Sequence, residues 1–327
     1  MPNTQRTLSK PAVPEFILLT GRSNPRLAKK IAKLLGHDIF DPVSIFSDGE
    51  IRVRVPENMR RRHVFIIQPT STPVNESIME IMFMIDASRR SSAREITLII
   101  PYFGYSRQDR KEMPRVPISS SVVANMFTNA GASRIVTVDI HSDQQQGFIQ
   151  IPWDNLYASY SLVPALKKKR FKNLVVASPD KGGMTRATGY AKRLGASDIA
   201  LVYKERDINV NNKSEALGMI GNVKGRDVLL VDDMLDTGGT IAHAASYIKQ
   251  QGAKSVRVAV THGLFSGKAL EHIKTSPIEE VIVTDTILQR DEVVKNPKIT
   301  VISVAPLLVE AIKRIESGDS ISRDLFL

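Results

Sequence analysis

The stretch Val228-Leu-Leu-Val-Asp232-Asp233-Met-Leu-Asp236-Thr237-Gly238-Gly239-Thr240 decides the fold of this 327-residue chain. It joins an apolar strand to two adjacent carboxylates, a turn with two glycines and the helical stretch 241–251. A strand that leads through such a turn into a helix is typical of an α/β protein with a parallel sheet. Ligands of parallel sheets bind beyond the carboxyl ends of the strands, so we expect the functional site at this turn.

Outward from this stretch, short β-branched runs alternate with segments of helical period in both halves of the chain. The expected strands are 16–20, 64–68, 96–100, 135–140, 174–177, 199–202, 228–231, 256–260 and 281–284. The expected helices are 25–35, 78–89, 119–130, 187–194 and 240–251. We therefore predict an α/β fold with two similar domains, each a mostly parallel sheet flanked by helices.

An internal echo supports a duplication. The segment Gly131–His141 reappears in altered form as Gly252–His262, in each case a glycine followed by a strand that ends in histidine. The alternative is that any two strand-and-helix units look alike. We predict a flexible N-terminal arm over residues 1–14, a first domain over 15–157 and a second over 158–327.

Composition limits the function. The net charge is +11 and the pI is about 9.7, which favours an anionic partner: nucleic acid, an acidic membrane surface or phosphorylated small molecules. The chain has no cysteine, which excludes disulfides, thiolate nucleophiles and cysteine zinc sites. No apolar run approaches the ~18 residues of a membrane span, and none resembles a signal peptide, so we expect a cytoplasmic protein without membrane partners.

The quoted stretch predicts a sugar-phosphate site. Backbone N–H groups from Asp236, Thr237, Gly238, Gly239 and Thr240 suit one phosphate group at a helix N-terminus. The acidic pair Asp232 and Asp233 would repel a phosphate, but it accepts hydrogen bonds from sugar hydroxyls. Ribose 5-phosphate satisfies both parts. The alternative is a capped helix with a solvated acidic turn.

A second anion cradle follows another predicted strand. It comprises Asp180, Lys181, Gly182 and Gly183, where paired glycines leave backbone N–H groups free for phosphate. An ordinary turn is the alternative reading. Two cradles in one half imply more than one phosphate.

Two further loops follow strands of the first half. The loop 101–111 contains aromatic residues and Arg107, whose guanidinium suits phosphate oxygens, although a nucleic-acid patch and a solvated loop are alternatives. His141 offers an imidazole to a metal, with a structural role as the alternative. Its counterpart His262 has no acid beside it, and we assign it a structural role.

Together these motifs resemble class I ribose-phosphate pyrophosphokinase, in order from about Phe16 to the carboxyl terminus. The resemblance implies a duplicated phosphoribosyltransferase-like fold with an ATP-binding first domain and a ribose-phosphate-binding second domain. Four residues would contact the adenine of ATP bound between subunits: Phe46, Asp48, Gly49 and Glu50. Arg107 and Gln108 would hold the ATP phosphates. His141 and Asp180 would ligate Mg²⁺, and the loop from Asp180 to Gly183 would hold pyrophosphate.

The resemblance also assigns catalytic cations. Lys204 and Arg206, on a polar loop after the strand 199–202, would close over the site and stabilise charge on the transferring group. The family's usual assembly is a homohexamer built from dimers. Ser121 stands where the family usually has lysine or arginine, which leaves the family's phosphate activation and ADP inhibition open for this chain.

The expected reaction moves the pyrophosphoryl group of ATP to O1 of ribose 5-phosphate, giving 5-phosphoribosyl 1-pyrophosphate and AMP. Two other hypotheses stay open: a catalytically silent regulatory subunit of such an enzyme, and a nucleic-acid binder that uses the positive charge. A Walker A motif and a Gly-x-Gly-x-x-Gly fingerprint are both absent, so neither a P-loop kinase nor a dinucleotide dehydrogenase is supported.

Overall fold

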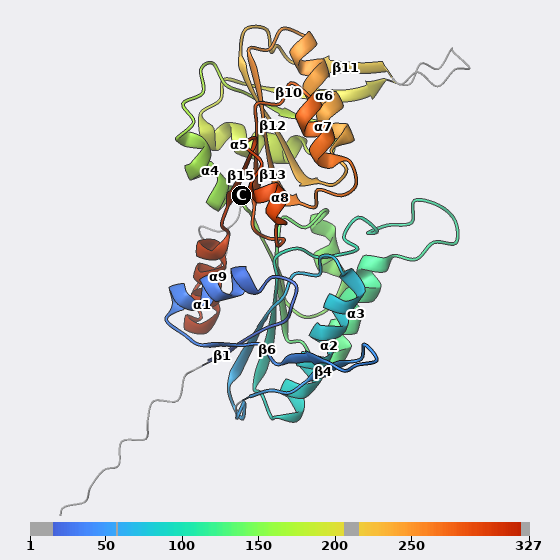
Figure 1. Cartoon of the computed structure of the whole chain (residues 1–327), viewed down its shortest axis with the longest axis vertical. Coiled ribbons are helices and arrows are strands. Elements are labelled where there is room, and N and C mark those ends of the chain that lie inside the picture. Colours follow the sequence, from blue (N-terminus) through green and yellow to red (C-terminus); the bar gives the residue numbers. More distant parts are fainter. Residues whose placement is uncertain (1–15, 57, 206–215, 322–327) are drawn as a thin grey trace, which may run out of the picture.

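Two β-sheets form the frame of the molecule, one in each half along its long axis (Figure 1). The computed structural model describes residues 16–56, 58–205 and 216–321, so the predicted arm over residues 1–14 lies outside it. Within these ranges, no helix is both long enough and apolar enough to cross a membrane.

The first sheet has six parallel strands in the order β2-β1-β5-β6-β7-β8. Their bounds are β1 Phe16–Thr20, β2 Ile39–Phe40, β5 His63–Ile67, β6 Glu95–Ile100, β7 Arg134–Val138 and β8 Trp153–Leu156. A separate antiparallel hairpin consists of β3 Val43–Ile45 and β4 Ile51–Val53. The helices of this half are α1 Pro25–Leu35, α2 Val74–Arg90, α3 Ser119–Ala130 and the 3₁₀ helix η1 Asp143–Phe148.

The second sheet has seven strands in the order β11-β10-β9-β12-β13-β14-β15, parallel except for the β10–β11 pair. Their bounds are β9 Val175–Ser178, β10 Asp198–Glu205, β11 Ala216–Ile220, β12 Asp227–Leu235, β13 Ser255–Gly263, β14 Glu280–Thr284 and β15 Ile299–Ile302. The helices are α4 Ser159–Lys167, α5 Met184–Leu194, α6 Gly239–Gln250, α7 Ala269–Thr275, α8 Asp291–Val294 and α9 Ala305–Ser317. The predicted α/β class, with mostly parallel sheets flanked by helices, is confirmed.

Three apolar clusters hold these layers together. One lies between the first sheet and helices α2 and α3, and one between the second sheet and helices α6 and α7. The third contains residues of both halves, including Leu27 of α1, Phe65 of β5, Leu229 of β12 and Leu308 of α9. The two halves therefore share one core, and the predicted division near residue 157 stays a prediction.

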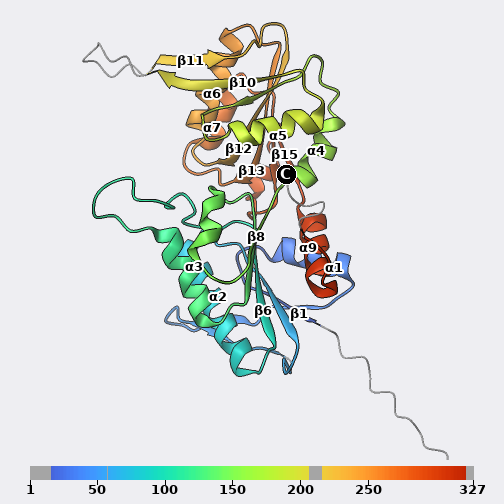
Figure 2. The same ribbon diagram turned by 180° about the vertical axis from the view of Figure 1, so that it is seen from behind.

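The last helix returns to the beginning of the chain. Helix α9 packs on α1 in the first half, as both ribbon views show (Figures 1 and 2). Helix α1 begins where the Asn24 side chain accepts a hydrogen bond from Leu27 N and where Pro25 supplies a fixed φ, and it ends at Gly36 in the left-handed region. The apolar surface buried between α1 and α9 holds the two halves of the chain together.

Strand β12 is longer than the predicted 228–231. It extends through Asp232 and Asp233 to Leu235, because β13 continues beside it and pairs Leu235 with Gly263. The acidic pair is therefore held on a strand rather than on a flexible turn, which restricts the directions of both carboxylates.

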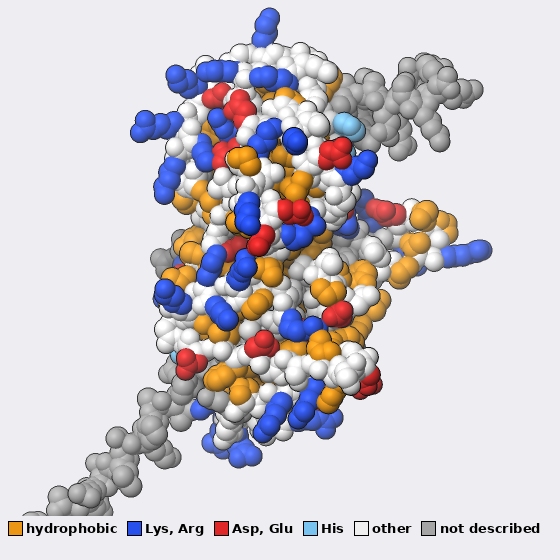
Figure 3. All heavy atoms as spheres, viewed as in Figure 1, with side chains coloured by type: hydrophobic (Ala, Val, Ile, Leu, Met, Phe, Trp, Pro, Cys, Tyr) orange, Lys and Arg blue, Asp and Glu red, His pale blue; other side chains and the backbone are white. Residues whose placement is uncertain are grey.

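On the face shown in Figure 3, lysine and arginine side chains are scattered among acidic and apolar ones. The excess positive charge of the chain is spread over this face and does not gather into one stripe, although groove-binding proteins concentrate such charge on one surface.

Asp285 is a centre of hydrogen bonds between the two helices α1 and α9. Its carboxylate accepts hydrogen bonds from Val304 N at 2.8 Å and Ser303 Oγ at 2.7 Å, and Lys30 Nζ lies 2.8 Å away. Its backbone oxygen accepts a hydrogen bond from Asn24 Nδ2. This single residue thus joins the start of α1 to the start of α9.

We predict that Asp285→Ala lowers the free energy of unfolding by about 2–3 kcal/mol, because it leaves buried donors without a partner. Lys30→Met is the control, since the lysine side chain is 54% exposed and its ion pair is worth under about 1 kcal/mol. Urea denaturation measures both. Equal, small losses in the two variants would contradict the role given to Asp285.

Candidate functional site

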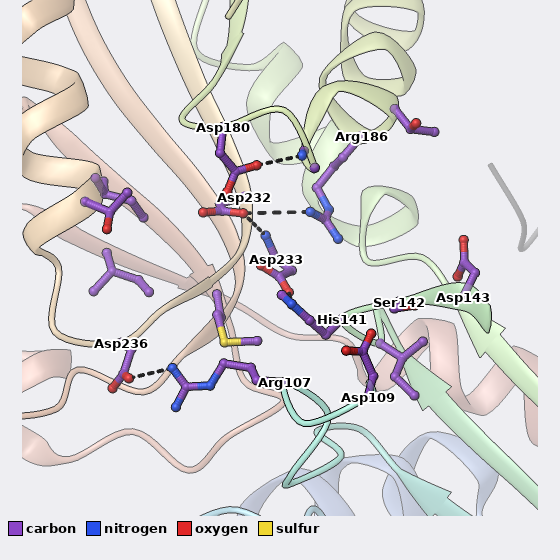
Figure 4. A pocket seen from close by; sticks show the side chains of 18 of the residues that line it. Arg107, Asp109, His141, Ser142, Asp143, Asp180, Arg186, Asp232, Asp233 and Asp236 are labelled. Atoms are coloured by element: carbon purple, nitrogen blue, oxygen red, sulfur yellow. Dashed lines mark hydrogen bonds and ion pairs between the residues drawn. The ribbon is translucent and has the colours of Figure 1, made fainter. Parts of the chain in front are cut away.

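A cavity of about 730 Å³ lies where the carboxyl ends of the two sheets meet (Figure 4). The loops after β6, β7, β9 and β12 supply its walls. Among the predicted site residues, it is lined by Arg107, His141, Asp180, Gly182, Gly183, Asp232, Asp233, Asp236, Thr237, Gly238 and Thr240. Lys181 and Gly239 lie on the same two loops. The structure therefore brings together motifs from both halves of the sequence.

A hydrogen-bonded pair joins the halves at the centre of this cavity. His141 Nδ1 lies 2.7 Å from Asp233 Oδ2, and the contact raises the pKa of His141. Burial alone would raise the pKa of Asp233, but the hydrogen bond to His141 and the charge of Arg186 hold it well below its usual range. The neighbouring Asp232 behaves differently, because burial and the charge of Asp233 raise its pKa well above the usual range. The pair is thus one charged carboxylate beside one that is reluctant to ionise.

Arg186 is the counter-ion of this acidic group. It lies in the first turn of α5, its side chain is 18% exposed, and its Nη1 is 3.9 Å from Asp232 Oδ1. Although burial lowers the pKa of a guanidinium, the charges of Asp139, Asp233 and Asp232 raise that of Arg186. One permanent cation therefore faces three carboxylates, which is the arrangement that makes such a cluster tolerable inside a protein.

The turn after β12, predicted as a phosphate cradle, leads into a helix whose N-terminus lies at the cavity. Gly238, with φ 75°, is the N-cap of the twelve-residue helix α6, and it lets the chain enter the helix with its first N–H groups at the cavity. His272 Nδ1 lies 2.8 Å from Thr237 O and supports the turn from behind. Free N–H groups at a helix N-terminus, beside the Thr237 and Thr240 hydroxyls, match a phosphate group.

A second cradle lies beside the first, because β9 and β12 are neighbours in the sheet. Asp180 Oδ1 accepts a hydrogen bond from Gly183 N at 2.9 Å, which shapes the loop that leads into α5. A Cβ at Gly183 would lie 2.4 Å from Ser178 Oγ, so only glycine fits there. The two N-termini of α5 and α6 thus present N–H groups to one cavity.

An ion pair crosses the cavity between the halves. Arg107 Nη1, from the loop after β6, lies 2.8 Å from Asp236 Oδ2, from the turn after β12 (Figure 4). Burial would raise the pKa of Asp236, but hydrogen bonds from Ser266 and Arg107 hold it below its usual range. The arginine predicted for the ATP phosphates and an acid predicted for ribose 5-phosphate therefore contact each other directly.

Some predicted residues do not reach this cavity. Phe46, Asp48, Gly49 and Glu50 form the exposed tip of the β3–β4 hairpin, where the Arg52 guanidinium lies 5.7 Å from the Phe46 ring centroid. Gly49 takes φ 94°, which the tight turn requires. Gln108 is exposed, and its Oε1 accepts a hydrogen bond from Ser119 Oγ instead. Among the described residues, none of these five lines the cavity, although Gln108 stands between Arg107 and Asp109, which do.

The predicted catalytic cations fall at the edge of the described residues. Lys204 lies in β10, where its backbone pairs with Leu217 of β11, but its side chain is outside the described part, and Arg206 lies outside it altogether. Strand β10 is the neighbour of β9, so the segment that follows Glu205 starts at the same end of the sheet as the second cradle.

The predicted Mg²⁺ ligands, His141 and Asp180, both line the cavity. In the described ranges, no group of three carboxylate or imidazole side chains is close enough to bind a metal ion by itself. Proteins usually hold Mg²⁺ through one or two carboxylates together with substrate phosphates and water. Asp233 engages Nδ1 of His141, which leaves Nε2 as the ring nitrogen for a ligand.

Three residues of the site have no place among the sequence-based predictions. Besides Arg186, Asp139 takes φ 44°, and its carboxylate accepts hydrogen bonds from Ala158 N and Thr261 Oγ1. Tyr157 lies 3.1 Å from Asp143 Oδ2, and burial together with that acid raises its pKa to about 12. A sequence signal existed for Arg186, which stands one helical turn before the buried Tyr190 and directly after a phosphate-type loop.

The counterpart histidine, His262, does not line the cavity. His262 is buried, and its ring contacts Thr286 Oγ1 at 2.9 Å and Asp139 O at 3.3 Å. Burial lowers its pKa, so it stays neutral beside the acidic cluster.

Comparison with known proteins places the chain in a family. A family model described as the N-terminal domain of ribose phosphate pyrophosphokinase matches residues 16–131, and one described as a phosphoribosyl synthetase-associated domain matches residues 207–326. The ribose-phosphate pyrophosphokinase of Ralstonia nicotianae is 48% identical, over 94% of this chain and 96% of that protein. That of Helicobacter pylori is 47% identical, over 94% and 95%.

A solved structure agrees with the sequence relatives. The phosphoribosylpyrophosphate synthetase of Mycobacterium smegmatis superposes with a TM-score of 0.86 at 38% identity, covering 93% of this chain and 99% of that one. At 93% coverage the match extends over both halves of the chain. The chain belongs to the ribose-phosphate pyrophosphokinase family of enzymes.

Proposed function

We propose that this enzyme transfers the pyrophosphoryl group of MgATP to O1 of ribose 5-phosphate, giving 5-phosphoribosyl 1-pyrophosphate and AMP. One observation carries the proposal: on a single strand–turn–helix unit, two carboxylates stand next to a phosphate cradle. A carboxylate accepts hydrogen bonds from vicinal hydroxyls, and the N–H groups at the helix N-terminus donate hydrogen bonds to the 5-phosphate. A sugar phosphate carries both groups at the short spacing that this unit offers.

The sugar would lie along the end of β12. Its phosphate would be held by the turn Thr237–Thr240, and its diol by Asp232 and Asp233. This seating points O1 towards the neighbouring Asp180–Gly183 loop, since β9 adjoins β12. That loop would hold the pyrophosphoryl group in line for attack.

The donor nucleotide would enter from the first half. Arg107 would exchange Asp236 for ATP phosphate oxygens, while Gln108 would assist from the same loop. The hairpin tip with Phe46, Asp48, Gly49 and Glu50 is remote from the cavity lining of its own chain, so it would serve the cavity of a second copy. The site would then be complete only in a homo-oligomer, for which we propose a hexamer built from dimers.

The residues of this chain supply positioning and charge. When ribose O1 attacks the β-phosphorus, negative charge accumulates on the transferring group and on departing AMP. Lys204 and Arg206, brought over the cavity with the segment after β10, would stabilise that charge more in the transition state than in the ground state. His141 and Asp180 would hold Mg²⁺, which when bound supplies charge neutralisation for the phosphates.

The family assignment favours an active enzyme over a silent regulatory subunit, since the relatives bear the enzyme's name. We predict that purified protein with MgATP and ribose 5-phosphate releases AMP, and that EDTA abolishes the release. A nucleic-acid binder would instead bind DNA with an affinity that falls steeply with salt and ignores ribose 5-phosphate. Absence of AMP, alone or with added phosphate, would support the silent subunit.

We predict that Lys204→Ala lowers turnover roughly a thousandfold, as is typical when a cation that acts in the transition state is removed. Affinity for ribose 5-phosphate should hardly change, because the effect is confined to the transition state. Lys224→Ala, an exposed lysine after β11, is the matched control. Fixed-time assays of AMP release measure turnover, and calorimetric titration measures the affinity for ribose 5-phosphate. Near-normal turnover in the Lys204 variant would refute the assignment.

We predict that Asp233→Asn weakens ribose 5-phosphate binding about 10- to 100-fold, since hydrogen bonds to a charged partner are worth about 1.5–3 kcal/mol. Asparagine keeps the shape and a contact to His141, so the fold should persist. The control is Glu271→Gln, an exposed acid on α7. Titration calorimetry without ATP measures the affinity. Unchanged binding in the Asp233 variant would remove the basis of the proposed function.

A further inference from the structure

A second cavity, of about 460 Å³, lies between the two halves. It shares no lining residue with the cavity of about 730 Å³ that contains His141 and Asp233, which we call the catalytic cavity. The first half contributes Arg22, Ser23, the segment 71–74, Glu76, Ser77, Glu80 and Tyr102. The second half contributes Leu264, Ser266 and the segment 287–290. None of these residues has a role in the proposed reaction.

This cavity lies directly behind the ion pair that crosses the catalytic cavity. On the second half, Ser266 N donates a hydrogen bond to Asp236 O at 3.0 Å, and Leu264 N donates one to Leu235 O at 2.9 Å. On the first half, Tyr102 opens the loop that carries Arg107. Asp236 is therefore bonded through its backbone to a residue that lines the second cavity, and Arg107 follows Tyr102, another lining residue, by five positions on one loop.

The lining charges are already neutralised. Arg22 Nε lies 2.5 Å from the buried carboxylate of Glu80, and its Nη2 lies 3.0 Å from Glu76. Arg290 pairs with Glu292 at 3.1 Å and donates a hydrogen bond to Phe265 O at 2.8 Å. A phosphorylated ligand would have to separate these pairs, so the cavity disfavours nucleotides.

Uncommitted polar groups remain inside it. The hydroxyls of Ser23 and Ser71, both at least nine-tenths buried, contact each other at 3.0 Å, which uses only one of their two hydrogens. The Gln289 amide nitrogen donates hydrogen bonds to Gly263 O and Ile287 O, whereas its carbonyl has no acceptor role in any contact of the described residues. One donor and one acceptor are thus left beside the apolar side chains of Leu264 and Leu288.

We propose that the second cavity binds an uncharged heterocycle of nucleoside size, and that its occupancy changes the affinity of the catalytic cavity for ribose 5-phosphate. The ring faces would pack on the apolar side chains, and donors and acceptors on its edge would pair with the free serine hydroxyl and the glutamine carbonyl. The coupling would run through the Leu264–Ser266 and Tyr102–Arg107 segments, because both hold the ion pair that the substrates must open. The predicted effect on ribose 5-phosphate affinity rests on the proposed function.

Leu288→Trp tests the site without touching the catalytic residues. Leu288 is 38% exposed at the rim, so a larger side chain fills the cavity from its mouth while the fold persists. Leu34→Trp is the matched control, because Leu34 is 54% exposed on α1 and lines neither cavity. The probes are uridine and guanosine, titrated by calorimetry with and without saturating ATP analogue.

We expect at least one nucleoside to bind the native protein and Leu34→Trp, and binding to fall tenfold or more in Leu288→Trp. We expect the bound nucleoside to change the Kd for ribose 5-phosphate threefold or more in the same two proteins. Binding of neither probe, competition with the ATP analogue, or unchanged binding in Leu288→Trp would each overturn the proposal. Nucleoside binding is measured without ribose 5-phosphate, so failure of the proposed function would leave this result readable.

Discussion

The meeting of two carboxyl ends is the constraint on which the rest of this structure depends. Strands of both sheets end at the same boundary, where His141 after β7 contacts Asp233 on β12 at 2.7 Å. Since loops at carboxyl ends carry the binding groups of parallel sheets, this arrangement directs the chemistry of both halves into one space. The apolar core that both halves share, which includes residues of α1 and α9, holds the two sheets in a fixed relative position.

The balance of charges in the cavity determines which of its carboxyl groups are ionised. Asp139, Asp232 and Asp233 gather around one guanidinium, that of Arg186, and the pKa values of the acidic pair separate as a result. A cluster with too few cations favours additional positive charge, whether from a metal ion with its nucleotide or from lysine and arginine on a closing loop. The excess of carboxylates in this cavity therefore favours the cations that the proposed reaction would require.

The Arg107–Asp236 ion pair joins a loop of the first half to a turn of the second half. Each partner belongs to the predicted site of a different substrate, and each is anchored on a segment that also lines the second cavity. A ligand in that cavity would act on both anchors at once, whereas a mutation in either loop acts on one. The same contact would therefore connect the two predicted substrate sites and the proposed regulatory site.

Local sequence determined the parallel α/β architecture, the two glycine turns and the acidic pair, because a strand, a glycine turn and a helix N-terminus are encoded within about a dozen adjacent residues. The sequence did not reveal the small edge strands, the extension of β12 or the return of α9 to α1, since these depend on partners that are distant along the chain. Arg186 and Asp139 were missed for the same reason: each is defined by carboxylates or donors from another segment. Tertiary structure alone decided that His141 faces Asp233, that Arg107 faces Asp236 and that the hairpin tip stays away from its own cavity, because only folding brings the two carboxyl ends together.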